Sequence, residues 1–276
     1  MTITPGLVPG LSNTDYHALT DWWGSTQLKT WLPEHYKPFS GNSEALSFGS
    51  LVHTLALEPA LMSQYVALDA VTIGVKADGT PAANPLMTAA WKRAAAEVES
   101  DGYTVIAKAD LDRATAMVDA IHDHPVAHGL LFSDDGVSEE SAFWVDDNGV
   151  QHKARFDRRI PGAIIDVKTT SAQPGAKSLV STCIGLGYDT SAAHYTTVAE
   201  GLGLDVDAFC HIWVAKSEPY RVTVTEMSED FMARGRVLRA LALERAANRA
   251  DAYEGATGYL TLTPPRWAQL TEEIPA

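Results

Sequence analysis

Apolar residues recur along most of the chain at the spacings typical of helices and strands. Between Glu44 and Leu57 they return every three or four positions, which places them on one face of a helix. The same spacing predicts helices at 25–32, 85–99, 109–123, 125–132, 173–183, 188–200 and 229–253. Alternating or continuous β-branched runs predict strands at 103–107, 139–145, 150–158, 163–169, 209–214 and 220–225.

Turn signals fix how several of these elements are joined. Asn148-Gly149 lies between two predicted strands and is a strong hairpin signal, and Pro161-Gly162 supplies the next turn. Residues 71–84 are rich in Gly, Pro and Asp and are predicted to form an exposed loop or a mobile flap. The pattern as a whole predicts an α/β (α+β) fold with a central mixed β-sheet flanked by helices.

The length of 276 residues and a hydrophobic content of 46% allow a substantial core. No repeat, low-complexity tract or domain boundary interrupts the pattern. We therefore expect a single domain, with 1–43 as a wrapping segment, 44–255 as the core and 256–276 as a tail.

The charge balance limits the classes of partner. With 21 basic and 35 acidic residues, the net charge is −14, which argues against a protein that coats DNA nonspecifically. Residues 151–170 nevertheless hold three more basic than acidic side chains. Two cysteines cannot build a four-cysteine metal site, and no signal peptide or long apolar run is present. We expect a cytoplasmic protein that does not contact a membrane.

The strongest candidate chemistry lies in the second hairpin. Asp166 and Lys168 are two apart on a predicted strand and so share a face, and pairing with the preceding strand brings Asp157 close. Carboxylate oxygens are the ligands that Mg²⁺ prefers. A D-x-K triplet alone is common on strand ends, but here it follows an apolar run of the kind that is buried.

Other chemistries are weaker. His122, His124 and His128 point in different directions around Pro125, so their spacing does not favour zinc. The chain contains no nucleophile elbow, P-loop or dinucleotide-binding loop. Arginines on the 229–253 helix alternate with acids, which is more typical of a solvated face with local ion pairs than of a DNA-binding surface.

The order of several motifs resembles the PD-(D/E)XK nuclease superfamily, in particular its RecB-like branch. These motifs are Gly49-x-x-x-His53, Phe156-Asp157, Ile165-Asp166-Val167-Lys168 and a following helix with Tyr195. The chain is more similar still to phage and prophage exonucleases of the RecE type, with matching segments in the same order at 11–17, 48–59, 166–170 and 265–267.

The resemblance implies a restriction-endonuclease-like core and a magnesium-dependent exonuclease, with Mn²⁺ as a substitute. Such an enzyme digests double-stranded DNA from the 5′ end and leaves a 3′ overhang for a RecT-like single-strand annealing recombinase. It also implies a ring-like homo-oligomer, a trimer or tetramer, in the host cytoplasm if the protein is phage-encoded.

The resemblance also implies roles for individual residues. Asp157 and Asp166 would hold the metal, together with the backbone carbonyl of Val167 and with His53 from the neighbouring helix. Lys168 would position or activate the attacking water and offset phosphate charge. Glu139 is a possible further acid, and Glu140 is a nearly equal candidate because strand register decides which of the two faces inward.

The DNA contacts are less well determined. Tyr195 would contact a phosphate, but Ser191 stands where the family usually has Gln, in Q-x-x-x-Y. A hydroxyl is shorter than a carboxamide, so a water, Tyr188 or His194 would have to replace that contact.

Arg155 and Arg158 are also predicted to bind DNA. Two alternatives remain open: a RecB-like nuclease that acts on single strands or flaps, and a DNA-binding recombination accessory protein with a vestigial nuclease site.

Overall fold

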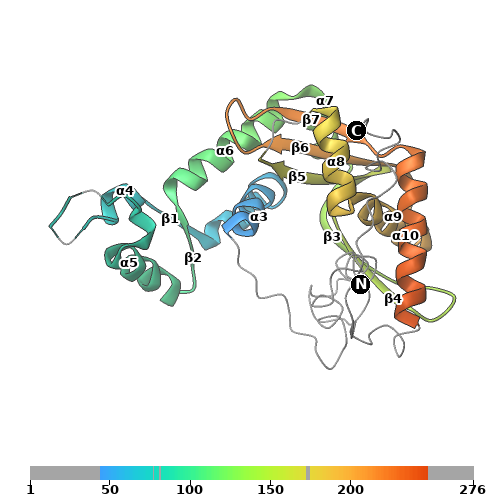
Figure 1. Cartoon of the computed structure of the whole chain (residues 1–276), viewed down its shortest axis with the longest axis horizontal. Coiled ribbons are helices and arrows are strands. Elements are labelled where there is room, and N and C mark those ends of the chain that lie inside the picture. The colour runs from blue at the N-terminus through green and yellow to red at the C-terminus, as the bar shows by residue number, and fades with distance from the viewer. Residues whose placement is uncertain (1–43, 77, 81, 172–174, 248–276) are drawn as a thin grey trace, which may run out of the picture.

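The fold is described from a computed structural model, which covers residues 44–76, 78–80, 82–171 and 175–247 (Figure 1). The predicted helix 25–32 and the segments 1–43 and 256–276 lie outside these residues. Five strands form the main sheet: β3 (Val137–Val145), β4 (Gln151–Ile160), β5 (Gly162–Thr170), β6 (Val206–Ala215) and β7 (Val222–Glu226). The helices around it are α3 (Glu44–Leu57), α6 (Lys108–Asp123), α7 (Pro125–Leu131), α8 (Ala176–Leu186), α9 (Tyr188–Gly201) and α10 (Glu229–Ala247).

The sheet is mixed, as predicted. Its strands lie in the order β3-β4-β5-β6-β7, and only the β5–β6 pair is parallel. A parallel pair needs a crossover connection, and α8 and α9 provide it. The predicted hairpin at Asn148-Gly149 joins β3 to β4, and Gly149 has a φ of 77° that favours glycine.

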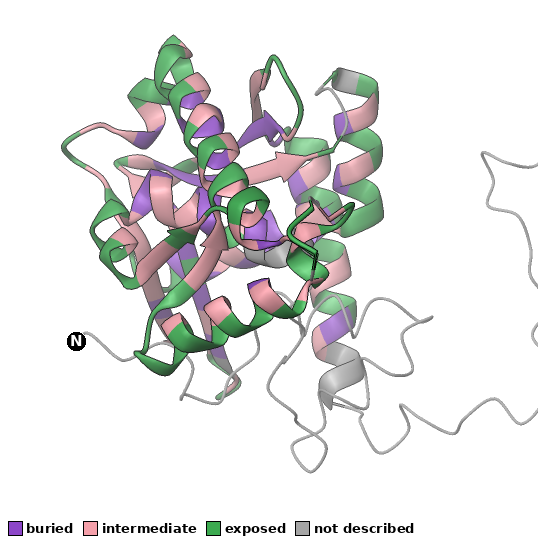
Figure 2. Cartoon of the chain, turned by 90° about the vertical axis from the view of Figure 1, so that its left-hand side faces the viewer, coloured by how far each residue is buried: buried purple, intermediate pink, exposed green. Residues whose placement is uncertain are grey.

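Helices cover both faces of this sheet and give three layers. One core cluster joins α3, α6 and α7 to Ile165, Val167 and Ile212 on one face. A second cluster joins α8, α9 and α10 to Ile164, Phe209 and other residues of the opposite face. Figure 2 shows the buried residues in the sheet and on the inward sides of the helices. In the described part of the chain, no helix has the length and apolar character needed to cross a membrane.

A small lobe lies beyond α3 and α6, and it contacts these two helices (Figure 1). It contains a parallel two-stranded sheet, three short helical segments and one longer helix. These are η2 (Pro59–Gln64), β1 (Tyr65–Leu68), α4 (Ala70–Ile73), η3 (Pro85–Met87), α5 (Ala89–Ser100) and β2 (Thr104–Ala107). The prediction of a loop over 71–84 is wrong at its start, because the Asp69 carboxylate caps α4 by accepting the N–H groups of Val71 and Thr72.

The strands β4 and β5 separate where the candidate chemistry lies. They pair through Arg158↔Ile165, Arg159↔Ile164 and Ile160↔Ala163, and the pairing stops before Asp157 and Asp166. We call this point the fork. At the fork, the N–H of Val167 is satisfied by a side chain, because it donates to Asp157 Oδ2 at 2.8 Å.

The neighbouring strand β3 is also irregular here. Glu139 would lie opposite Asp157 but is missing from the paired register, and its backbone has a φ of 52°. A left-handed backbone is uncommon in a residue other than glycine and costs energy. Phe156 belongs to the core under α9, whereas Ile160 packs against the core under α3. Two residues four apart on a regular strand would share a face, so β4 twists sharply around Asp157.

A buried ion pair fastens α9 to α10. Arg234 donates to the carboxylate of Asp189, which is completely buried. Arg236 pairs with Glu229 on the exposed side of α10, as its charge pattern predicted. The two helices also approach closely at Gly235, where an added Cβ would lie 2.1 Å from the backbone oxygen of Asp189.

Replacing Gly235 with Ala is therefore expected to destabilise the protein. Because the clash is with backbone and cannot be relieved by a rotamer change, we expect a loss of about 1–3 kcal/mol in the free energy of unfolding. Gly129→Ala is the matched control, since nothing lies within 4 Å of its added Cβ on α7. Urea unfolding of both variants tests this, and equal midpoints would contradict the close approach.

Candidate active site

The helix α3 brings His53 to the backbone of β5. Phe48, Leu51 and Val52 pack into the core, and Gly49 lies one turn before His53. An added Cβ on Gly49 would lie 3.8 Å from Thr169 Oγ1, so this face of α3 runs along the end of β5. His53 Nε2 lies 2.8 Å from the carbonyl oxygen of Val167. Since a carbonyl can only accept, Nε2 carries the proton and donates.

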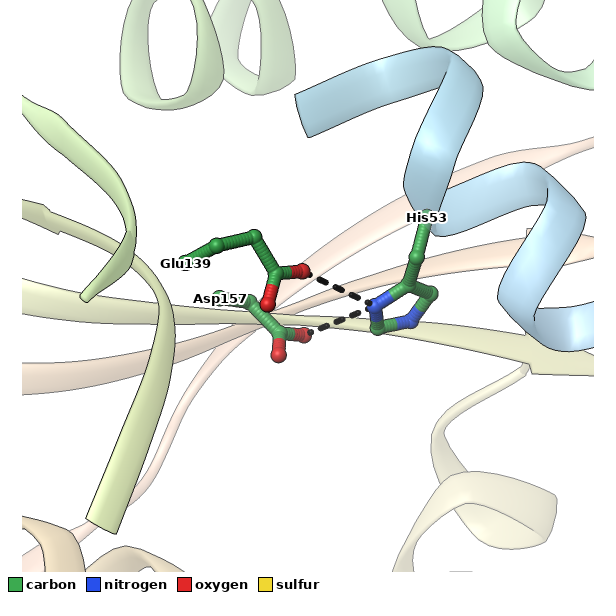
Figure 3. Close-up of side chains that lie close together, drawn as sticks. All are labelled: His53, Glu139 and Asp157. Carbon is green, nitrogen blue, oxygen red and sulfur yellow. Dashed lines mark ion pairs between the residues drawn. The ribbon is translucent and has the colours of Figure 1, made fainter. Parts of the chain in front are cut away.

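Glu139 and Asp157 face the other nitrogen of the same ring (Figure 3). His53 Nδ1 lies 3.6 Å from Asp157 Oδ2 and 3.9 Å from Glu139 Oε1. One ligand atom from each of the three residues lies within 4.8 Å of the other two. The helix α3 and the two strands of the β3–β4 hairpin, which lies far along the chain from α3, thus converge on one point. Glu139, and not Glu140, lies in this group, because Glu140 pairs with Arg159.

The two carboxylates around Nδ1 of His53 favour a cation between them and the ring. With Nε2 donating to Val167, a neutral His53 would present the lone pair of Nδ1 to two carboxylates. A proton on Nδ1 removes that repulsion. Burial alone would lower the pKa of His53, but Asp157 and Glu139 outweigh it and raise the pKa to about 9. A divalent metal could occupy the same place, because carboxylates are ligands for Mg²⁺ and Mn²⁺ and imidazole is a ligand for several transition metals.

Asp166 and Lys168 form a second charged group beside the first. Lys168 Nζ lies 2.5 Å from Asp166 Oδ2, and the side chain of Asp166 is only 6% exposed. Burial would raise the pKa of Asp166, but Lys168 and His211 outweigh it and hold the pKa below its usual range. Burial would lower the pKa of Lys168, but Asp166 and Asp157 raise it overall. Both groups are therefore charged at neutral pH.

Asp157 joins the two groups electrostatically. Burial and the charge of Asp166 raise its pKa to about 6, against the opposing effects of His53 and Lys168. Carboxylates crowd together in this way where a metal or a proton is to be shared.

Arg155 lies at the edge of the site and balances some of its charge. The arginine donates to the carboxylate of Glu139, and its Nη2 lies 3.4 Å from Glu58 Oε2. Its side chain is 45% exposed. Arg155 thus links Glu139 to the start of the small lobe and stays accessible to a ligand.

The other predicted DNA contacts lie deeper. Arg158 is buried and donates to Ser138 Oγ and to the carbonyl of Ser133. Ser191 is buried on α9. Tyr195 packs edge-on against Phe156 with ring centroids 5.7 Å apart, and burial together with Asp166 and Asp157 raises its pKa. Their contacts with DNA stay predictions.

Two neighbours of Asp166 and Lys168 were not among the predicted catalytic residues, although Tyr188 was a candidate for the DNA contact usually made by Gln. His211 on β6 lies beside Asp166 in the parallel register, with Nε2 3.5 Å from Asp166 Oδ2. Tyr188 at the start of α9 places its ring 5.0 Å from Lys168 Nζ. A histidine in the middle of the predicted strand 209–214 was the available signal, but only the strand order reveals its neighbour.

The histidines at the α6–α7 junction have other uses. His124 caps α7 by accepting the N–H of Ala127, and His122 stacks on Phe132 at 3.7 Å. His122 Nδ1 and His128 Nδ1 lie 3.4 Å apart. Among the residues that the structure describes, His53, Glu139 and Asp157 are the one group of three or more potential ligands gathered closely enough for a metal.

The raised pKa of His53 predicts that metal binding releases a proton. At pH 7.5 the ring is protonated in the metal-free protein, and a metal can bind Nδ1 only after that proton leaves. We expect Mn²⁺ binding to release about one proton, seen in calorimetry as a heat that depends on the buffer's ionisation enthalpy.

His53→Gln is the matched variant and should release fewer protons; an unchanged proton count would contradict the assignment. The proton also affects folding. Because the pKa rises from 6.5 to about 9 on folding, its stabilising effect is complete below pH 6.5 and disappears as the pH rises through 9.

Comparison with known proteins identifies the family of the chain. The model of a family described as a PDDEXK-like domain of unknown function (DUF3799) matches residues 26–246. The chain belongs to this family. A search of curated proteins finds no relative.

Among solved structures, a "Putative exonuclease" from Eubacterium rectale aligns with a TM-score of 0.61 at 16% identity. The alignment covers 92% of this chain and 89% of that one. The structure of SSO0001 aligns at 13% identity over 75% of this chain and 88% of that one, with a TM-score of 0.29, and supports no comparison.

We expect the letters of the family's motif to correspond to Asp157 on β4 and to Asp166 and Lys168 on β5, and this assignment stays a prediction. The predicted PD-(D/E)XK fold with a mixed sheet between helices is confirmed.

Proposed function

We propose that the protein is a metal-dependent exonuclease that digests one strand of duplex DNA from its 5′ end. The observation that carries the proposal is the convergence of His53, Glu139 and Asp157 beside the Asp166–Lys168 pair, at the fork of a PDDEXK-like sheet. The donor set supports Mg²⁺, with Mn²⁺ as a substitute. The Eubacterium rectale protein with this fold is described as a "Putative exonuclease", which agrees with the proposal.

The residues suit phosphodiester hydrolysis. A bound Mg²⁺ would supply neutralisation of phosphate charge and activation of water. Asp157, Glu139, His53 and Asp166 would hold it. Lys168, with its raised pKa, stays protonated and so stabilises negative charge that develops on the phosphate, rather than accepting a proton from water. Arg155 is exposed enough to bind a neighbouring phosphate.

The biological setting follows from the similarity to RecE-type exonucleases. The 3′ overhang produced would serve a RecT-like annealing recombinase in phage-type recombination, in the cytoplasm of the host. A ring-like trimer or tetramer would thread the duplex, and positive charge within the ring would outweigh the negative exterior because screening limits charge effects to about 10 Å.

Digestion of linear duplex labelled separately at the 5′ and 3′ ends tests this function. We expect early release of the 5′ label, with Mg²⁺ present and not with EDTA. Early release of the 3′ label would contradict the polarity. Preference for single strands or flaps would favour a RecB-like nuclease instead. Binding of duplex without cleavage in Mg²⁺ or Mn²⁺ would favour an accessory protein with a vestigial site.

A further inference from the structure

His211 is buried beside the candidate site and no role in the proposed reaction has been assigned to it. It lies in the middle of β6, next to Asp166 in the parallel β5–β6 register. Its side chain has 0% exposure, and Nε2 lies 3.5 Å from Asp166 Oδ2. Within the described residues, neither ring nitrogen makes a conventional hydrogen bond, so this contact is the polar one that the ring has.

Three aromatic rings hold the imidazole in place. The ring centroids of Trp213, Phe209 and Tyr188 lie 5.1, 5.2 and 5.7 Å from that of His211. Trp213 is fixed in turn, because its Nε1 donates to Thr225 Oγ1 at 2.8 Å. The imidazole therefore has little freedom to turn away from Asp166.

An apolar side chain would suit this environment better than histidine. Burying a polar group with weak hydrogen bonding destabilises a protein relative to an apolar residue of similar shape. Histidine at this position therefore lowers the stability of the fold. Such a cost is expected where the contact, here with Asp166, serves the function of the protein. The contact also favours a particular orientation of the carboxylate, since both Lys168 Nζ and His211 Nε2 lie on the side of Oδ2.

We propose that His211 is a positioning residue for Asp166. By holding Oδ2 together with Lys168, it fixes the carboxylate plane and leaves Oδ1 as the oxygen for the metal. This inference rests on the proposed function, in which Asp166 is a metal ligand. Residues that orient metal ligands from behind commonly change metal affinity or activity by about 10–100-fold when replaced.

The test compares His211→Phe, which keeps the aromatic packing and removes the nitrogens, with His211→Gln, which keeps a donor. In calorimetry we expect His211→Phe to weaken Mn²⁺ binding by about 10–100-fold and His211→Gln to recover most of it. The Mg²⁺ concentration for half-maximal DNA digestion should rise by a similar factor, while the maximal rate at saturating Mg²⁺ changes less.

His152→Phe is the matched control. His152 is also buried beside an aspartate and a tryptophan, with Nε2 3.1 Å from Asp146 Oδ2 and its ring 5.1 Å from that of Trp144. It lies near the hairpin end of β4, where it pairs with Trp144 across to β3. Its replacement should lower the unfolding midpoint without weakening Mn²⁺ binding.

The outcomes separate the inference from the proposed function. A folded His211→Phe protein that binds Mn²⁺ with wild-type affinity would overturn the inference, whatever its rate of DNA digestion. If His211→Phe does not fold, equal Mn²⁺ affinities of His211→Gln and His211→Met, which lacks the donor, would overturn it. A wild-type protein that binds Mn²⁺ but cuts no DNA would overturn the proposed function. The inference about His211 would then be decided by the Mn²⁺ affinities of the variants. A wild-type protein that binds no Mn²⁺ overturns both.

Discussion

Replacing Asp166 with Asn is expected to lower the rate of duplex digestion by at least about 1000-fold. The carboxylate is buried and carries its charge at neutral pH, because Lys168 and His211 hold its pKa down against the effect of burial. An amide is nearly the same size but is neutral, so it cannot offer the metal an anionic oxygen. The fold should persist, since shape and the neighbouring core residues are unchanged.

Asp207→Asn provides the control, because it makes the same change at an exposed position of the adjacent strand β6. Initial rates on end-labelled linear duplex and thermal unfolding of both variants complete the comparison. An Asp166→Asn protein that keeps a tenth of wild-type activity or more would rule out the assigned role.

Replacing Lys168 with Met is expected to lower the maximal rate by about 10²–10³-fold even at saturating Mg²⁺. The ammonium lies 2.5 Å from Asp166, and its raised pKa keeps it charged at every pH at which the enzyme would work. Its loss removes stabilisation of charge in the transition state and leaves two neighbouring carboxylates with less compensation. Lys168→Arg should restore only part of the rate, because a planar guanidinium differs in shape from an ammonium.

Lys92→Met is the control for Lys168→Met, since Lys92 is exposed on α5 in the small lobe. Single-turnover rates at several Mg²⁺ concentrations separate a rate effect from a metal-affinity effect. If excess Mg²⁺ returned Lys168→Met to the wild-type rate, Lys168 would act on metal binding alone.

The main sheet could be predicted from sequence because its signals are local. Alternation, the Asn148-Gly149 turn and the β-branched run before Asp166 identify β3, β4 and β5. In the small lobe, the predicted helix 85–99 and strand 103–107 correspond to α5 and β2, but β1 was not predicted. The strand β1 has four residues and pairs in parallel with β2, far along the chain, so nothing within its own sequence marks it.

The spacing of motif residues along the chain predicted part of the candidate site. The family motif identified Asp157, Asp166, Lys168 and His53, which the structure gathers around the fork. The sequence could not decide between Glu139 and Glu140. The left-handed backbone at Glu139 and the twist of β4 break the regular alternation of side chains, from which the face of the sheet that each residue occupies is predicted. A role for His211 could not be predicted, because only the order of the strands in the sheet places it beside Asp166.

The parallel pairing of β5 with β6 also has a consequence for protein synthesis. His53 and Val167 are 114 residues apart, and β6 follows β5 only after α8 and α9. A nascent chain that has emerged only as far as β5 carries every proposed metal ligand, yet lacks the strand that completes the sheet beside Asp166. Domains generally fold as units during synthesis. Completion of the sheet beside Asp166 therefore waits until translation has passed β6, although every proposed metal ligand has been synthesised by then.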